Sequence, residues 1–293
     1  MIAKAEDVTA AVLAEMHRTP EPRTKEVLSS LIRHLHAFVR ETRLTEREFQ
    51  DAIGYVNAIG QHTTPSHNEA MLLAGSLGVS NLVCLMNNGD RGRRATQANN
   101  LGPFYRSGSP RMKNGDSLVR SPTLGSPLLF KGWIRDPSGA AIASAEVDVW
   151  HPSPVGLYEN QDPGQAEMNL RGSFVTDAEG AFGFVSVKPS GYPVPTEGPT
   201  GALLRAQKRH NWRPAHIHFL VYKPGYKTIA SQVYDPSDPH LETDSQFGVT
   251  QALIGNFRKE KEQFVLEFTF VLEPGESWLP QPPITHKVAA QPA

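Results

Sequence analysis

The sequence predicts an α+β protein, with a helical N-terminal domain over residues 1–95 and an all-β sandwich over residues 96–293. Two features of the chain support this division. Apolar residues recur at helical spacing from Glu6 to about Asn88, whereas beyond residue 95 they alternate with a period of two. Between these stretches, the polar and glycine-containing segment Asn87–Arg94 is typical of a connection between two folded units.

The N-terminal domain is expected to contain four helices. Thr45 followed by Glu48 has the spacing of a capping box, and Ser66 with Glu69 repeats it before the last helix. That last helix, Ala70–Met86, is apolar on most of its circumference, which is typical of a helix buried between layers or between subunits. The apolar positions that define the earlier helices are Val12, Leu13, Met16, Val27, Leu28, Leu31, Ile32, Leu35, Phe38, Val39, Phe49, Ile53, Val56 and Ile59.

The second domain is expected to hold seven or so short strands bounded by turn residues, which is the pattern of a β-sandwich. Two intervals, Pro152–Arg171 and Pro189–Trp212, are too long for hairpin turns, and loops of that length in a compact domain usually carry function. The expected strands are Leu128–Ile134, Ala145–Trp150, Ser173–Thr176, Phe182–Val187, Ala215–Tyr222, Thr228–Tyr234 and Phe264–Leu272.

The composition limits the compartment and the partners. Because 29 Lys and Arg face 30 Asp and Glu, nothing in the net charge favours nucleic acid or an anionic membrane, and we expect a small neutral or weakly acidic partner. The single cysteine, Cys84, excludes an internal disulfide, and Met1–Thr9 lacks the apolar core of a signal peptide. No apolar run reaches membrane-spanning length. We therefore expect a cytoplasmic protein.

Two histidines on one predicted strand form the centre of the candidate site. A β-strand sends successive side chains to opposite faces, so His216 and His218 point to the same side and can share one metal ion. Ile217 points the other way, into apolar packing. Two ligands do not complete a metal site, and further ligands must come from elsewhere in the chain.

Each long loop carries one tyrosine in a stiff, turn-rich setting. Tyr158 follows Gly156-Leu157, and Tyr192 follows Gly191 and precedes Pro193-Val194-Pro195. A phenol loses its proton near pH 10, so its use as an anionic ligand at neutral pH requires a strongly acidic metal such as ferric iron. Two tyrosinates and two neutral imidazoles would cancel two of the three charges of that ion, which suits a partly buried pocket.

With these residues the chain resembles the intradiol ring-cleaving dioxygenases, in the branch that has an N-terminal helical dimerisation domain and contains catechol and hydroxyquinol 1,2-dioxygenases. The resemblance covers most of the chain from about Ala70. It is carried by the segments Val147–His151, Gly156–Tyr158, Asn169–Gly172, the loop around Tyr192, Arg213–Phe219 and Ser231–Tyr234.

The resemblance implies one ferric ion per subunit, with Tyr158 and His216 as equatorial ligands and Tyr192 and His218 as axial ligands. Arg213 matches the arginine that lies beside the substrate in this family. Gln232, Arg213 and Tyr192 are the expected catalytic residues: Gln232 matches a glutamine just outside the ligands, and Tyr192 leaves the iron to take a substrate proton. Arg213 would stabilise the negative charge that develops on the substrate.

Within the family the hydroxyquinol branch is the better match. The expected substrate is benzene-1,2,4-triol, cleaved between its vicinal hydroxyls with O2 to give maleylacetate in aromatic catabolism. Cys84 stands where hydroxyquinol enzymes often have an aspartate, and Gln246 where an apolar residue is more usual, so the accepted ring substituents stay open. The resemblance implies substrate contacts from Leu101, Gly102, Pro103, Phe104, Val194, Pro195, Cys84, Gln246 and Arg213.

Several alternatives remain at this point. Catechol or a substituted catechol giving a cis,cis-muconate is the second choice of substrate. A zinc hydrolase could combine the two histidines with Asp235 or Glu242, and a non-catalytic module could dimerise through its helices and bind an apolar ligand. For the main interpretation, the partners are the aromatic diol or triol, O2 and a second copy of the chain. The resemblance extends to the lipid that relatives hold between the helices of their dimers.

Overall fold

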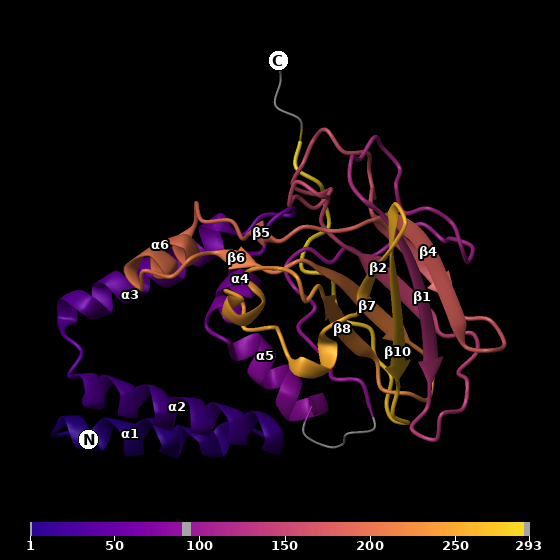
Figure 1. The fold of residues 1–293 in the computed structure, drawn as a ribbon. Coiled ribbons are helices and arrows are strands. Elements are labelled where there is room, and N and C mark those ends of the chain that lie inside the picture. The colour runs from indigo at the N-terminus through magenta and orange to yellow at the C-terminus, as the bar shows by residue number, and fades with distance from the viewer. Residues whose placement is uncertain (1, 90–94, 290–293) are drawn as a thin grey trace. The chain divides into compact units, whose positions relative to one another are not determined.

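The computed structural model describes residues 2–89 and 95–289. It divides into two compact units, Met1–Asn57 and Ala58–Ala293 (Figure 1). The prediction of a helical region followed by a sheet-rich domain is confirmed. The predicted connection Asn87–Arg94 lies partly outside the described residues, and the domain boundary at residue 95 stays a prediction.

The first unit is helical, and its helices begin and end at clear sequence signals. The Glu21 carboxylate accepts a 2.9 Å hydrogen bond from the Arg23 backbone, and Arg43, at φ 52°, ends the same helix in the left-handed region. The predicted capping box is confirmed, because Glu48 Oε2 accepts from the Thr45 backbone at 2.9 Å. The elements are α1 (Ala5–Ala14), η1 (Glu15–Arg18), α2 (Pro22–Thr42) and α3 (Glu46–His62), which extends past Asn57.

The prediction of one helix over Ala70–Met86 is wrong. The structure has α4 (Glu69–Ser76), α5 (Val79–Cys84) and the π-helical turn η2 (Leu85–Gly89). Gly78 adopts φ 73°, a left-handed conformation that glycine tolerates best, and this residue separates α4 from α5. The second predicted capping box is also wrong, because Asn68 rather than Ser66 accepts from the Met71 backbone, at 2.9 Å.

Among the described residues, no single helix is both long and apolar enough to cross a membrane. The segments Glu69–Ser76 and Val79–Asn87 reach that length and composition only as a pair, and the pair is bent by 78°.

The second unit contains two four-stranded sheets and a two-stranded one. The orders are β4-β1-β10-β9, β3-β2-β7-β8 and β5-β6. All seven predicted strands are present, with ends shifted by one or two residues. They are β1 (Pro127–Arg135), β2 (Glu146–Trp150), β3 (Arg171–Val175), β4 (Ala181–Val187), β7 (His216–Tyr222), β8 (Ile229–Tyr234) and β10 (Gln263–Val271).

Three strands and one α-helix were not expected from the sequence. The interval Pro189–Trp212 holds β5 (Tyr192–Pro193), β6 (Trp212–Arg213) and helix α6 (Pro199–Ala206), so treating it as a loop throughout was wrong. Pro199 occupies the first turn of α6, where proline is favoured because its missing N–H has no partner to lose. The third strand is β9 (Phe257–Glu260), an exposed edge strand with little apolar character.

The sandwich core lies between the two sheets and leaves the other face of β7 for the site. Ile217, Phe219 and Val221 are buried in the core, whereas His216, His218 and Leu220 alternate with them and face the opposite side. Leu220 belongs to a second apolar cluster with Leu72 of α4 and both loop tyrosines. The sheet thus presents the histidines to the loops and to α4.

Candidate metal centre

Neighbouring strands set the orientation of the two histidines. In the sheet register, His216 lies opposite Tyr234, and His218 lies between Gln232 and Trp150. His216 Nδ1 donates to the carbonyl of Pro214 at 2.7 Å, which leaves the Nε2 lone pair facing the site. The ring of His218 stacks on Trp150, with ring centroids 4.7 Å apart and planes 10° from parallel. Both histidines are fully buried.

The two tyrosines arrive from separate loops and meet at their hydroxyls. Tyr192 in β5 pairs with Arg213 in β6, so the short ribbon carries the tyrosine to the site next to the arginine. Gly156, at φ 81°, precedes Tyr158, and a side chain there would begin 3.0 Å from the Tyr192 Cβ. The hydroxyls of Tyr158 and Tyr192 are 3.4 Å apart.

The spacing of the four polar atoms fits one small cation. The Nε2 atoms of His216 and His218 are 3.1 Å apart. Two adjacent ligands with metal bonds of about 2.1 Å lie about 3 Å from each other. Arg213 Nη1 lies 3.5 Å from Tyr192 Oη and 3.3 Å from His216 Nε2, so the arginine joins the pair of phenols to the pair of imidazoles. The structure therefore brings together all four predicted ligands.

The donor set also limits the kind of metal. Within the described residues, no group of three or more His, Cys, Asp and Glu side chains is placed to hold an ion. Asp235 pairs with Lys188, and Glu242 is exposed, so neither joins the histidines as the zinc-hydrolase alternative requires. Two phenols with two imidazoles suit ferric iron, for the reason of charge given above.

Burial keeps the histidines neutral and ready to bind a cation. It lowers the pKa of His216 to about 3, and the positive charge of Arg213 acts in the same direction. Burial likewise holds the pKa of His218 well below its ordinary value, with His216 and Arg213 contributing. At neutral pH both imidazoles are therefore uncharged, which is the form that ligates metals.

Burial has the opposite effect on the two phenols. It raises the pKa of Tyr158 well above its ordinary value, with Tyr192 adding to the effect. It also raises the pKa of Tyr192, although Arg213 opposes that change. Without a metal both residues are protonated phenols, and only a strongly acidic cation would displace both protons at neutral pH.

Arg213 is held by a dense set of buried partners. Its Nε and Nη2 atoms donate to the two oxygens of Asp244, both at 3.0 Å. Nη2 also donates to Gln232 Oε1 at 2.9 Å and to Tyr234 Oη at 3.1 Å. Burial acts to lower the pKa of Arg213, but Asp244, Tyr192 and Tyr234 together outweigh it, and the pKa lies well above its ordinary value. The guanidinium is therefore a fixed positive charge beside the ligands.

Gln232 connects this network to the segment that carries several predicted substrate contacts. Its Nε2 donates to the backbone oxygen and to Oδ1 of Asn100, both at 3.0 Å. The next residues approach the ligands directly. A side chain at Gly102, which has φ 78°, would lie 3.1 Å from His218 Cε1, and the Phe104 ring lies 4.7 Å from the ring of Tyr158. Pro103 between them is buried.

The other predicted substrate contacts divide into two groups. Val194 is buried in one apolar cluster with Tyr158 and Tyr192, Leu101 packs against the same cluster, and Pro195 is half-buried beside Val194. Gln246 and Cys84 are not members of this apolar cluster.

Gln246 is buried against the end of α4. Its Nε2 donates to Ser76 Oγ at 2.6 Å, and its backbone N–H donates to Asp244 Oδ1 at 3.1 Å. A side chain at Gly75 would collide with Gln246 Oε1, so glycine makes room for the amide. Gln246 is therefore linked through Asp244 to the Arg213 network.

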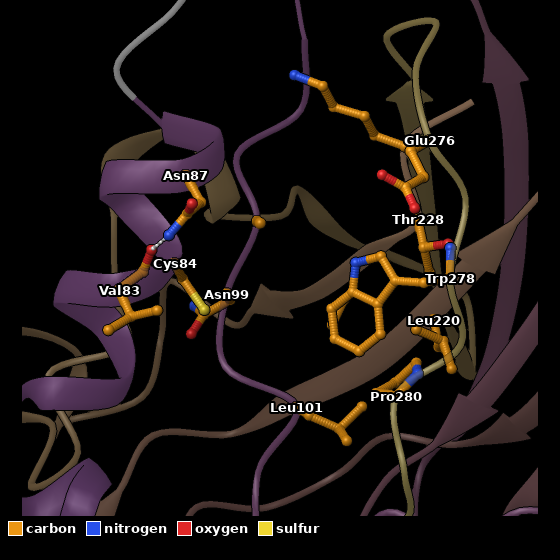
Figure 2. Close-up of a pocket in the computed structure, with 13 residues that line it drawn as sticks. Val83, Cys84, Asn87, Asn99, Leu101, Leu220, Thr228, Glu276, Trp278 and Pro280 are labelled. Atoms are coloured by element: carbon orange, nitrogen blue, oxygen red, sulfur yellow. Dashed lines mark hydrogen bonds between the residues drawn. The ribbon is translucent and has the colours of Figure 1, made fainter. Parts of the chain in front are cut away.

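Cys84 lies elsewhere, at the end of α5, where it lines a cavity of about 580 Å³ together with Leu101 (Figure 2). Among the described residues that line this cavity, none is a predicted metal ligand, and Arg213 and Gln246 are not among them. Cys84 thus lies in a cavity apart from the predicted metal ligands, together with one other predicted substrate contact, Leu101. The reason is the break at Gly78, after which the chain turns away from the direction of α4.

Sequence reasoning missed Asp244, Tyr234, Asn100 and Ser76. A buried arginine needs a buried carboxylate, and that rule could have prompted a search for a partner of Arg213. Several carboxylates follow in the sequence, however, and only the fold of the loop that contains Asp244 selects one. Tyr234 could have been found, since it lies two residues from Gln232 on the same face of a predicted strand.

Comparison with known proteins places this chain and its fold among the dioxygenases. Residues 101–274 match the family model described as dioxygenase, and residues 21–94 match the model described as catechol dioxygenase N terminus. The 6-chlorohydroxyquinol 1,2-dioxygenase of Cupriavidus pinatubonensis is 38% identical over 269 residues, which cover 92% of this chain and 97% of that protein. The catechol 1,2-dioxygenase of Candida albicans is 36% identical, covering 86% of this chain and 84% of that protein.

A solved structure extends the similarity to the fold. The hydroxyquinol 1,2-dioxygenase of Pseudomonas putida superposes with a TM-score of 0.83 at 34% identity, covering 92% of this chain and 99% of that chain. The chain belongs to the intradiol ring-cleavage dioxygenase family. It is therefore an oxidoreductase of a family that acts on aromatic diols or triols with O2 and generally uses non-haem ferric iron. Membership excludes the alternative of a non-catalytic module.

Proposed function

We propose that this chain is a hydroxyquinol 1,2-dioxygenase that cleaves benzene-1,2,4-triol between its vicinal hydroxyls and gives maleylacetate. One ferric ion per subunit would be held by Tyr158, Tyr192, His216 and His218. The observation that carries the proposal is the meeting of two phenol oxygens and two imidazole nitrogens around Arg213, in a fully buried site. The hydroxyquinol and chlorohydroxyquinol enzymes among the relatives support the choice of the triol.

When bound by these four residues, ferric iron would supply Lewis-acid chemistry that makes the aromatic ring reactive toward O2. The protein residues handle protons and charge. Tyr192 Oη would accept a proton from one substrate hydroxyl, and Arg213 Nη1, 3.5 Å away, limits the rise in the pKa of this phenol. The fixed charge of Arg213 would then stabilise negative charge on the substrate oxygens, because Asp244 and Gln232 hold the guanidinium in place.

The segment after Asn100 would position the ring and exclude water. Gly102 leaves space beside His218 that any side chain would fill, and Phe104 places an aromatic ring against Tyr158. Val194, nearly fully buried, closes the apolar side. A dry pocket strengthens each electrostatic contact and protects reactive oxygen chemistry from water.

A catechol is the alternative substrate, and the catechol enzyme of Candida albicans is nearly as similar as the first relative. The buried amide of Gln246 favours the triol. As a substrate contact, a group that can donate and accept hydrogen bonds would meet a third ring hydroxyl better than a bare C–H edge. The pair formed by Gln246 and Ser76 would therefore contribute to selection among ring substituents.

We propose a homodimer, which the helices of the first unit support, and a cytoplasmic location, which the single cysteine supports. Within the described part of α1, α2 and α3 no residue is buried. Helices α2 and α3 are nonetheless amphipathic, with apolar residues gathered on one face of each helix. The apolar residues that these two helices expose are Val27, Leu28, Leu31, Leu35, Phe38, Val39, Phe49, Ile53 and Val56. An apolar stripe of this extent marks an interaction surface, and we propose that a second copy of the chain, with or without lipid between the copies, covers it.

Oxygen uptake on purified, iron-analysed protein tests the proposed function. The substrates are hydroxyquinol, catechol, 4-methylcatechol, chlorocatechols and pyrogallol, with iron content, visible spectrum and sedimentation mass measured on the same sample. We expect about one iron per subunit, a red-brown colour from tyrosinate-to-iron charge transfer, a dimer, and the fastest uptake with hydroxyquinol. His218→Ala should weaken iron binding by at least about 100-fold, and Tyr192→Phe should shift the visible band.

Each result tests a separate part of the proposal. Poor turnover of hydroxyquinol with good turnover of catechol would replace the substrate and keep the chemistry. A colourless, iron-free protein that is inactive toward every vicinal diphenol would contradict the metal site itself. An unchanged spectrum in Tyr192→Phe would remove that residue from the iron.

A further inference from the structure

The cavity that contains Cys84 is a second, separate opening on the site-bearing face of the β3-β2-β7-β8 sheet. Its floor is Leu220 of β7 and Ala230 of β8, which are cross-strand partners two pairs beyond His218 and Gln232. Its walls come from α5 and η2, from residues 98–101 and from residues 276–280. At about 580 Å³, the cavity is in the size range of small-molecule sites.

A hydrogen-bonded partition separates the cavity from the metal centre. The Asn99 backbone N–H donates to the Ala230 carbonyl at 2.8 Å, and Gln232 Nε2 donates to the Asn100 carbonyl at 3.0 Å. These bonds fix the segment 99–100 onto β8 between the two sites. A molecule in the cavity therefore contacts neither the predicted ligands nor Arg213.

One end of the cavity suits a flat apolar ring. Leu101, Leu220, Pro280 and the indole of Trp278 line it, and Figure 2 shows Trp278 across the cavity from Cys84. The backbone N–H of Trp278 donates to Thr228 Oγ1 at 3.1 Å, so the segment that carries the indole is tied to the start of β8. Trp278 is nonetheless 63% exposed, which leaves a large aromatic surface available for stacking.

The other end carries an excess of negative charge. Lys227 Nζ is paired with Glu273 at 3.1 Å, which neutralises the lysine. Glu276, drawn at the far end from Leu101 in Figure 2, takes part in none of the ion pairs within residues 2–89 and 95–289. A carboxylate in this position accepts a hydrogen bond from an O–H group and repels another carboxylate.

We propose that this cavity binds a neutral hydroxylated aromatic molecule outside the catalytic centre, with its ring on Trp278 and its hydroxyl toward Glu276. A cavity of about 150 Å³ already admits benzene, so the larger volume here favours substituted or bicyclic phenols over a single bare ring. The site excludes aromatic carboxylates of the same shape. It uses none of the proposed catalytic residues and does not depend on the metal.

Cys84 provides a specific probe, because it is the only cysteine of the chain and lines the cavity. The experiment measures, by mass, the rate at which a small neutral methanethiosulfonate reagent labels Cys84 at mildly alkaline pH. The matched probes are 2-naphthol and 2-naphthoate, which share one ring system and lack the vicinal hydroxyls of a substrate. Burial raises the pKa of the Cys84 thiol, so labelling is slow enough to follow.

We expect 2-naphthol to slow labelling about tenfold when its concentration is about ten times Kd, whereas 2-naphthoate has no effect. The protection should be equal in iron-loaded and metal-free protein. Glu276→Gln keeps the shape and removes the charge, so 2-naphthoate should then protect as well. Ala230→Phe fills the floor and Trp278→Ala removes the stacking surface, and each should reduce protection by 2-naphthol at least several-fold.

The outcomes that overturn the proposal are equally specific. Absence of protection by 2-naphthol would show that no phenol binds here. Protection only in the iron-loaded protein would place the compound at the metal centre. Undiminished protection in both Ala230→Phe and Trp278→Ala would exclude this cavity as the binding site. Because Trp278 is exposed, we expect Trp278→Ala to fold even if Ala230→Phe does not.

Discussion

The two histidines of the centre are held by different physical means, and the protein around them differs accordingly. His216 is oriented by a hydrogen bond to the Pro214 carbonyl and lies next to Arg213. His218 is oriented by stacking on Trp150, in a row that continues across the sheet to Arg171. A hydrogen bond fixes both the ring plane and the tautomer, whereas stacking fixes only the plane. The protein therefore fixes the orientation and tautomer of His216 more completely than those of His218.

Two of the buried arginines, Arg213 and Arg171, show the same contrast. Arg213 has a buried carboxylate to itself, and both oxygens of Asp244 accept from it. Arg171 and Arg106 instead share Glu159 Oε1, at 2.8 and 2.7 Å. Burial lowers the pKa of Arg171 despite Glu159, whereas Asp244, together with Tyr192 and Tyr234, holds the pKa of Arg213 well above its ordinary value. The pairing around Arg213 is thus closed, meaning that one carboxylate pairs with one arginine. The pairing around Arg171 is shared, meaning that one carboxylate pairs with two arginines.

Replacing Arg213 or Arg171 should give the largest loss of stability, and the loss should differ between the closed and the shared pairing. Arg213→Met leaves Asp244 as a buried charge without its partner, so we expect a loss of about 3–5 kcal/mol in the free energy of unfolding. Arg171→Met leaves Glu159 paired with Arg106, so the expected loss is about 1–3 kcal/mol. Urea denaturation of the metal-free proteins measures both.

A double variant provides the control. Arg213→Met combined with Asp244→Asn removes both charges, and it should recover part of the stability that Arg213→Met alone loses. Equal losses for the two arginine variants would show that the closed and shared arrangements do not differ. A double variant as unstable as the sum of its parts would attribute the loss to packing.

The acid dependence of the metal-free protein tests both histidines at once. The pKa of folded His216 is about 3, against an ordinary value of 6.5. Between those pH values the unfolded chain binds a proton that the folded chain excludes, so stability falls as pH falls. For His216 the loss from pH 7 to pH 5 is about 2 kcal/mol. The lowered pKa of His218 acts in the same direction.

Denaturation at pH 7, 6 and 5 measures this slope. His216→Gln and His218→Gln should each remove a share of it, and His286→Gln, at an exposed position, serves as the matched control. A slope that disappears with His216→Gln alone would mean that stacking does not exclude the proton from His218 as hydrogen bonding does from His216.

The strands could be predicted from the sequence because a strand with one face in the core shows apolar residues at every second position. Along β7 the residues Ile217, Phe219 and Val221 alternate with the two histidines, and this alternation identifies both the strand and its two faces. The break between α4 and α5 was missed for the opposite reason. Glycine is tolerated within helices, and only the φ of 73° at Gly78 shows that this one ends a helix.

The site divides along the same line. Stiff loops and shared strand faces indicated Tyr158, Tyr192, His216 and His218 before any coordinates, and the structure places their polar atoms together. Residues whose position depends on how distant loops fold back gave no such signal. Asp244 reaches Arg213 over 31 positions of sequence, and Ser76 reaches Gln246 over 170. The same break at Gly78 sets the direction of α5 and with it the place of Cys84, whose role as a substrate contact stays a prediction.

The smallest difference between the two sides should appear when one hydroxyl is removed from each. Tyr234 Oη accepts from Arg213 Nη2 at 3.1 Å and from Asn99 Nδ2 at 3.3 Å, and it donates to Gln232 Oε1. Tyr105 Oη makes one bond, to Asp148 Oδ2 at 3.1 Å, beside Trp150. Tyr234→Phe should therefore cost about 1–3 kcal/mol and Tyr105→Phe about 1 kcal/mol or less, measured by urea denaturation. Both variants keep the ring and its packing, so the comparison isolates the hydroxyl. A greater loss of stability in Tyr105→Phe would show that the side near Trp150 contributes more to stability than its hydrogen bonds indicate.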